Sequence, residues 1–324
     1  MRLRVALLGI LAAAICPPSS AHAQSYPTAK PIRMIIPAAA AGASDIIARV
    51  TADHLEKTLG QRVIVDSRPG AGGNLGADIT AKSPPDGYTL CLIQIGNVAI
   101  NPFIFKDMPF DALADLAPVA PIVNLTEVVA VNGDLPVQSV KDLVALAKRE
   151  PGQLNYGSAG TGTTSHLAGV LFELMSGVKM THVPYRGAAP ALVDVAAGQV
   201  QLAFVGLGSA NVLTGTGKLK VLAVGNLKRL PAAPEIPTVD ESGVPGYEFI
   251  AWFGIVGPRG LPPDIVALLN RHVAMMLDDP VVQKRFEDAG MEPLKESTAE
   301  FARRIRADYD KFAKVVKAAD LKPE

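Results

Sequence analysis

Short apolar runs alternate with helical patterns along most of the chain. Runs rich in β-branched residues predict strands over residues 32–36, 62–65, 88–95, 128–131, 180–183, 200–205 and 219–224. The segment 45–59 repeats apolar residues at helical spacing, which predicts a helix that stops at Gly60. Because strands and helices alternate, we expect an α/β fold with mainly parallel sheets covered by helices on both faces.

Capping residues predict where several later helices begin. Ser139 can cap a helix over 140–149, and a helix over 167–176 follows a loop rich in glycine. The C-terminal part is predicted to be helical, with helices opened by Pro262-Pro263-Asp264, by Asp279-Pro280 and by a capping box of Ser297 and Glu300. No long run of Pro, Gly and Ser predicts a flexible linker, so two domains would be joined by short crossings of the chain.

The first 23 residues have the three parts of a secretory signal peptide. Arg2 and Arg4 form a basic start, an apolar run over 5–15 follows, and Ala21-His22-Ala23 fits a cleavage site. The apolar run is too short to span a bilayer. We therefore expect residues 1–23 to be removed and the mature protein to be soluble in the periplasm.

The charge and the cysteine count exclude several classes of function. The chain has 31 Lys+Arg and 31 Asp+Glu, and loss of Arg2 and Arg4 leaves 29 against 31, so we expect no nucleic-acid partner. Only Cys91 remains after cleavage, which allows no internal disulfide. The 5 histidines show no metal-ligand spacing, and no phosphate-binding, zinc-protease or nucleophile-elbow motif is present. We expect no cofactor, no metal and no catalytic residue.

Four turn-rich junctions follow predicted strands, where open α/β sheets bind their ligands. In the first, small side chains precede a helix, and the candidate ligand-binding residues are Ala38, Ala39, Gly42, Ala43, Ser44 and Asp45. Free amides and the helix dipole can bind an anion at such a place. Capping by Ser44 or Asp45 alone is the simpler interpretation of this segment.

The second junction contains more hydroxyl groups than one helix cap requires, which favours ligand binding. Its candidates are Ser158, Thr161, Gly162, Thr163, Thr164, Ser165 and His166. Catalysis by Ser165 and His166 is not expected, because neighbours at a helix start point in different directions and no acid completes a triad.

The remaining junctions contribute fewer candidates. In the third, Tyr185 could form a pocket wall and Arg186 could pair with a carboxylate, although a plain surface turn explains them equally well. In the fourth, Gly96 and Asn97 follow a predicted strand.

Several stretches resemble the Bug receptors, the substrate-binding proteins of tripartite tricarboxylate transporters. The most specific are Ser67-Arg68-Pro69-Gly70-Ala71-Gly72-Gly73-Asn74-Leu75-Gly76, Asp86-Gly87-Tyr88-Thr89-Leu90 and His182-Val183-Pro184-Tyr185-Arg186-Gly187, and the match covers essentially the whole mature chain. The resemblance implies a type II periplasmic binding-protein fold, in which two α/β lobes enclose a ligand cleft. It places 24–125 and 236–324 in the first lobe and 126–235 in the second.

The resemblance also implies a function. A ligand carboxylate would be held between the loops 38–45 and 158–166, partly through water, and delivered to inner-membrane transporter subunits. The ligand would be a dicarboxylate, a tricarboxylate or an aromatic acid, and the receptor a monomer rather than an enzyme. A sensor that presents its ligand to a signalling protein, or a periplasmic enzyme using Ser165, His166 or Asp45, are the alternatives.

The chain departs from the family pattern at two places. The family's first loop usually reads P-F-A-P-G-G-G-[TS]-D, whereas this chain has alanine at 38, 40, 41 and 43, which predicts a wider or differently shaped pocket. Many members carry an aspartate where this chain has Val205-Gly206. Since Val205 cannot hold a ligand ammonium group, this argues against an amino-acid ligand.

Overall fold

The computed structural model describes residues 26–38, 43–231 and 233–318. The predicted signal peptide and the candidate residues Ala39 and Gly42 lie outside these ranges.

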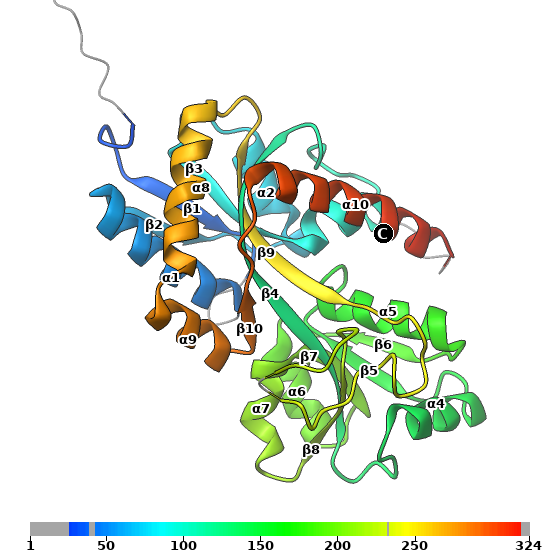
Figure 1. The fold of residues 1–324 in the computed structure, drawn as a ribbon. Coiled ribbons are helices and arrows are strands. Elements are labelled where there is room, and N and C mark those ends of the chain that lie inside the picture. Colours follow the sequence, from blue (N-terminus) through cyan, green and yellow to red (C-terminus); the bar gives the residue numbers. More distant parts are fainter. Residues whose placement is uncertain (1–25, 39–42, 232, 319–324) are drawn as a thin grey trace, which may run out of the picture.

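The strands form one continuous, mixed sheet that two lobes share (Figure 1). We call the first lobe the half that contains β1 (Ile32–Ile36), β2 (Val63–Ser67), β3 (Thr89–Gln94), β9 (Ile250–Pro258), β10 (Met291–Pro293) and the first part of β4 (Leu116–Asn132). Its helices are α1 (Ala43–Leu59), α2 (Asn74–Ala81), α3 (Asn101–Ile104), α8 (Pro263–Leu277), α9 (Pro280–Asp288) and α10 (Thr298–Ala318). Two short helical turns, η1 (Ala71–Gly73) and the π-helical η2 (Gly96–Ile100), complete it.

The second lobe, green in Figure 1, contains the other half of the sheet. Its strands are the end of β4 together with β5 (Asn155–Ser158), β6 (Thr181–Pro184), β7 (Leu202–Gly206) and β8 (Leu219–Val224). Its helices are α4 (Val140–Arg149), α5 (Thr164–Ser176), α6 (Ala188–Ala196) and α7 (Leu207–Thr214).

Strand β4 carries the chain from one lobe to the other. Its residues up to Thr126 pair with β9, whereas its residues from Glu127 onward pair with β7 and β8. The segment that leads from β8 back to β9 contacts the same point of β4, because the Gly225 amide donates to the Glu127 carbonyl at 2.8 Å. Glu127 therefore stands where the two lobes join.

The local capping signals are confirmed. The Ser139 hydroxyl accepts from the Asp142 amide at 3.2 Å at the start of α4, and Asp279 accepts from the Val281 amide at 2.8 Å. Ser297 and Glu300 form the reciprocal bonds of a capping box before α10. Helix α5 begins at Thr164, three residues before the predicted start, so the candidate residues from Thr164 to His166 form its first turn.

Three expectations about the secondary structure are wrong. The sheet is mixed rather than mainly parallel, because β4 runs antiparallel to β7, β8 and β9, and β3 runs antiparallel to β9. The C-terminal part is not only helical, since β10 adds a strand to β4. Strand β4 is also far longer than the predicted 128–131, and it accommodates Pro118 and Pro121 next to irregularities in its pairing with β9.

The apolar residues of both lobes are buried against the sheet. The largest buried cluster extends from β1 and β3 through β9 to Phe172 on α5 and Phe204 on β7. A second cluster covers the other face of the second lobe and includes Val128 and Val205. Among the described residues, no helix combines the length and apolar character needed to cross a membrane.

Candidate functional site

The loop before α5 is held together by its own hydroxyl groups. Thr163 donates to the Gly160 carbonyl at 2.6 Å, and the Ser165 hydroxyl accepts from the Ala159 amide at 2.8 Å. Thr163, the N-cap residue, makes no side-chain capping bond to the helix. The hydroxyls of these two residues thus shape the loop. Because no side chain caps α5, its N-terminus is a place where an anion could bind.

Two stacked imidazoles lie beneath this loop. The rings of His166 on α5 and His182 on β6, which we call the histidine pair, stack with centroids 4.0 Å apart. His182 Nε2 lies 2.6 Å from the Ser158 hydroxyl, and His166 Nδ1 accepts from the Gly162 amide at 3.2 Å. Burial lowers the pKa of His182 to about 4, and burial together with His182 lowers the pKa of His166 to about 3. Both rings are therefore neutral near pH 7, and they support the loop by packing and hydrogen bonding.

A buried acid lies under the same helix start. Thr164, the first residue of α5, donates from its hydroxyl to Glu127 Oε1 at 2.8 Å. Glu127 is only 4% exposed. Burial raises the pKa of Glu127 to about 7, although the Thr164 bond opposes the shift. Sequence reasoning missed this residue, and the available signal was a lone acid inside a long apolar segment.

The loop before α5 contacts the first lobe at two glycines. A Cβ added at Gly96 would lie 3.0 Å from the Gly162 carbonyl oxygen, and a Cβ added at Gly162 would lie 2.9 Å from Asn101 Oδ1. Only residues without a side chain allow so close an approach. The lobes are thus in contact where the predicted second and fourth junctions meet.

The first-lobe side of this contact is built by asparagines. Asn97 donates to the Gly72 carbonyl at 2.8 Å, so its side chain holds η1 in place. Asn101 donates to the same carbonyl at 3.0 Å and to Asn74 Oδ1 at 2.6 Å. Asn101 Oδ1 is buried and has no hydrogen-bond partner among the described residues. Asn101 was not predicted as a site residue, although it lies four positions after Asn97.

The described residues of the first junction lie at the end of β1 and the start of α1. The Ala38 carbonyl accepts from the Ser67 hydroxyl at 2.6 Å, Ala43 opens α1, and Ser44 is buried. Asp45 pairs with Arg49 at 2.9 Å within α1, and its Oδ1 is buried with no partner in the described chain.

The other candidates are spread around the loop before α5. Thr161 is half-buried within the loop. Tyr185 donates from its hydroxyl to Asp194 at 2.7 Å, and its amide donates to the Ser158 carbonyl at 3.0 Å. Arg186 is exposed beside it. Val205 packs its side chain into the second apolar cluster.

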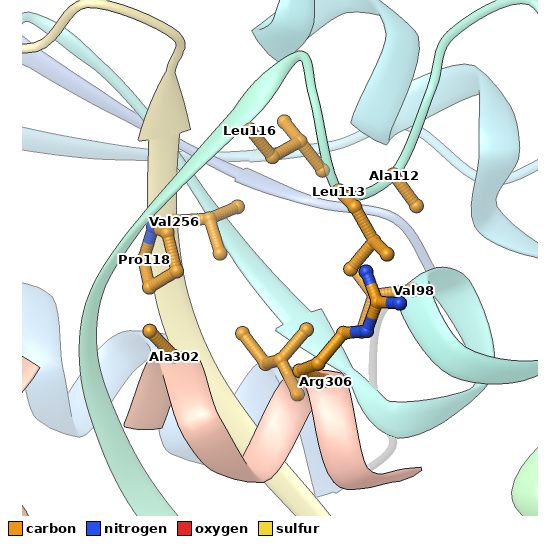
Figure 2. A pocket seen from close by; sticks show the side chains of 9 residues that line it. Val98, Ala112, Leu113, Leu116, Pro118, Val256, Ala302 and Arg306 are labelled. Atoms are coloured by element: carbon orange, nitrogen blue, oxygen red, sulfur yellow. The ribbon is translucent and has the colours of Figure 1, made fainter. Parts of the chain in front are cut away.

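A cavity of about 250 Å³ lies elsewhere, in the first lobe (Figure 2). Apolar side chains from η2, β4, β9, α10 and the segment before β4 line it, with Arg306 as the one charged side chain. Arg306 pairs with Asp310 at 3.2 Å. Because a carboxylate needs several converging donors, the inter-lobe loops are the better candidate site.

The described residues hold no sign of metal or thiol chemistry. No group of three or more His, Cys, Asp or Glu residues is placed to bind a metal ion within the part of the chain that the structure describes. Burial raises the pKa of Cys91 to about 12, which keeps this thiol protonated.

Comparison with known proteins identifies the family of this fold. The sequence model described as "Tripartite tricarboxylate transporter family receptor" matches residues 47–321. The protein BugT of Bordetella pertussis is 33% identical over 319 residues, covering 98% of this chain and 98% of that protein.

Solved structures agree with this assignment. The structure of R. palustris Rpa4515 with adipate has a TM-score of 0.87 and 37% identity, covering 92% of this chain and 100% of that chain. The structure of MatC (Rpa3494) from Rhodopseudomonas palustris with bound malate has a TM-score of 0.83 and 28% identity, covering 89% and 99%. The fold is therefore that of the periplasmic binding proteins, with two α/β lobes, and the chain belongs to the family of tripartite tricarboxylate transporter receptors.

Proposed function

We propose that this protein is a periplasmic receptor that closes on a small, non-amino organic carboxylate. The carboxylate binds at the first turn of α5 and is enclosed by the start of α1 and by η2 of the first lobe. The observation that carries the proposal is the uncapped start of α5, which lies against the first lobe at Gly96.

The relatives support the choice of ligand class. The structures of Rpa4515 and MatC contain adipate and malate, which are both dicarboxylates. A second carboxylate group on the ligand would reach the first lobe, where α1 and α2 begin. Near the end of β7, where an acidic side chain could hold a ligand ammonium group, this chain has Val205, so amino acids are poor candidates.

A thermal-shift screen of the mature chain tests the proposal. At 100 times its Kd, a ligand adds about 2.7 kcal/mol of stability. We expect adipate, malate or another dicarboxylate to raise the unfolding temperature, whereas the matched diamides, which have the same shape without charge, should not. Stabilisation by free amino acids alone, or by the diamides as strongly as by the acids, would refute it.

Delivery to membrane subunits of a transporter requires a separate test. We propose that the receptor acts as a monomer and hands its ligand to inner-membrane partners of the tripartite class. Light scattering should give the mass of one mature chain. Cells that lack the receptor should lose uptake of the labelled ligand and regain it with the wild-type gene, and unchanged uptake in the deletion strain would contradict this role.

A further inference from the structure

Glu127 is an acid that the fold has placed where a ligand anion is expected to bind. It lies at the lobe crossing, pairs with Gly206 on β7 and is 4% exposed. Its Oε1 accepts from Thr164 at 2.8 Å, while Oε2 is buried with no partner among the described residues. A buried, half-satisfied carboxyl group is costly and calls for a functional explanation.

The position of Glu127 conflicts with that of a bound carboxylate. Thr164 is the first residue of α5, so the Glu127 carboxyl lies at the same helix start, which has no side-chain cap. One helix N-terminus carries about half a positive charge, which stabilises one anion but not two. Two carboxylates that share a buried site do not both ionise, because their repulsion raises one pKa.

The surroundings of Glu127 supply no compensating cation. The groups found next to it are the Thr164 hydroxyl from α5, the Tyr247 phenol, which donates to the Ala168 carbonyl, and the uncharged backbone of Gly206 and Gly225. The titratable groups of α5 are His166, which is neutral near pH 7, and Glu173, whose pKa is raised by burial. Within the described ranges, no lysine or arginine pairs with Glu127.

We infer that Glu127 couples ligand capture to uptake of a proton: when a ligand carboxylate occupies the start of α5, the Glu127 carboxyl holds a proton taken from solvent. The inference rests on the proposed function, because it requires an anion at this helix. The ligand stays ionised, and the neutral Glu127 keeps accepting the Thr164 bond through Oε1. Burial already holds the pKa of Glu127 at about 7, so Glu127 is only partly protonated near neutral pH. Ligand capture makes its protonation complete.

Isothermal titration calorimetry of the full mature chain tests the coupling. Adipate and malate are titrated between pH 6.5 and 8.5 in buffers of different ionisation heat, where both probes are fully ionised. We expect proton uptake that rises toward one per ligand at pH 8.5, and a Kd that increases by about tenfold per pH unit above the midpoint. Binding without uptake would overturn the inference while leaving the proposed function intact.

Two variants isolate the residue. Glu127→Gln keeps an acceptor for Thr164 and should bind with no proton uptake and an affinity that does not change with pH. Glu173→Gln on α5 is the matched control, because Glu173 accepts from the Met180 amide at the other end of the helix, and it should keep the wild-type uptake. Wild-type uptake in Glu127→Gln would overturn the assignment. If that variant does not fold, Thr164→Val should move the midpoint to higher pH, and an unmoved midpoint would count against Glu127.

The sign of the proton linkage separates the remaining explanations. If Glu127 instead served as the counter-ion of a ligand ammonium group, binding of aspartate would release a proton, which would overturn the inference. If no carboxylate or amino acid binds at any pH, both the proposed function and the coupling are wrong.

Discussion

Substitution of Gly162 by alanine would separate the cost of backbone strain from the cost of blocked lobe closure. Gly162 has a φ of +77°, and an added Cβ would lie 2.9 Å from Asn101 Oδ1 and 3.0 Å from Ile104 Cδ1. The left-handed backbone costs alanine about 1–2 kcal/mol in any state of the protein. The overlap with the first lobe exists only when the lobes are in contact, and overpacking of this kind costs about 1–3 kcal/mol.

Backbone strain and overlap with the first lobe affect different measurements. The strain lowers the free energy of unfolding but cancels in ligand binding. The overlap weakens binding by roughly 5- to 150-fold, because closure is needed to enclose the ligand. Calorimetry with the ligand found in the thermal-shift screen gives the Kd, and small-angle scattering shows whether saturating ligand still compacts the variant.

Gly177→Ala is the matched control for this experiment. Gly177 ends the same helix with a φ of +69°, and an added Cβ would meet nothing within 4 Å. It should lose about the same stability with an unchanged Kd. Wild-type affinity in Gly162→Ala, or an equal loss of affinity in Gly177→Ala, would show that overlap at Gly162 does not block lobe closure.

Three further predictions concern buried polar groups. Because burial raises the pKa of Glu127 from 4.5 to about 7, the stability from its neutral form is present below pH 4.5 and lost as the pH rises through 7, roughly 3 kcal/mol in all. Urea titrations from pH 5 to 8.5 should show this decline in the wild type but not in Glu127→Gln. The histidine pair acts in the opposite direction. Because burial lowers both pKa values, the neutral rings contribute stability above pH 6.5, and this stability is lost as the pH falls toward 4. His182→Phe should therefore flatten the acid limb of stability against pH, and an equally steep limb would contradict the assignment. Asn101→Ala should cost about 1–3 kcal/mol in urea unfolding, because it leaves Asn74 Oδ1 without its donor, whereas the exposed Asn211→Ala on α7 should change stability by less than about 0.5 kcal/mol.

The sequence was sufficient for features that depend on near neighbours. Ser139, Asp279 and the pair Ser297 and Glu300 cap helices as predicted, because a capping bond joins residues two or three positions apart. Strand β8 has the predicted bounds, Leu219–Val224, since its apolar run is short and bounded by turn residues. The family motifs could also be recognised from short stretches of sequence, and the family match and the fold confirm the resemblance.

The long strands β4 and β9 could not be predicted from local sequence patterns. Prolines at 118 and 121 argue against a strand, yet β4 runs through both because irregular pairing with β9 absorbs them. Strand β9 is buried over almost its whole length and shows no alternation of polar and apolar residues, so its period gave no signal.

The candidate site divides along the same line. The sequence alone identifies the loops that are rich in glycine and hydroxyl groups. That these loops bind the ligand remains a prediction, which ligand screening tests. That Gly162 approaches Asn101, that His166 stacks on His182, and that Glu127 lies under Thr164, 37 residues away along the chain, was decided only by the tertiary structure. Local propensities depend on a few neighbouring residues, whereas the environment that neutralises a buried acid or brings two glycines into contact exists only after the chain has folded back on itself.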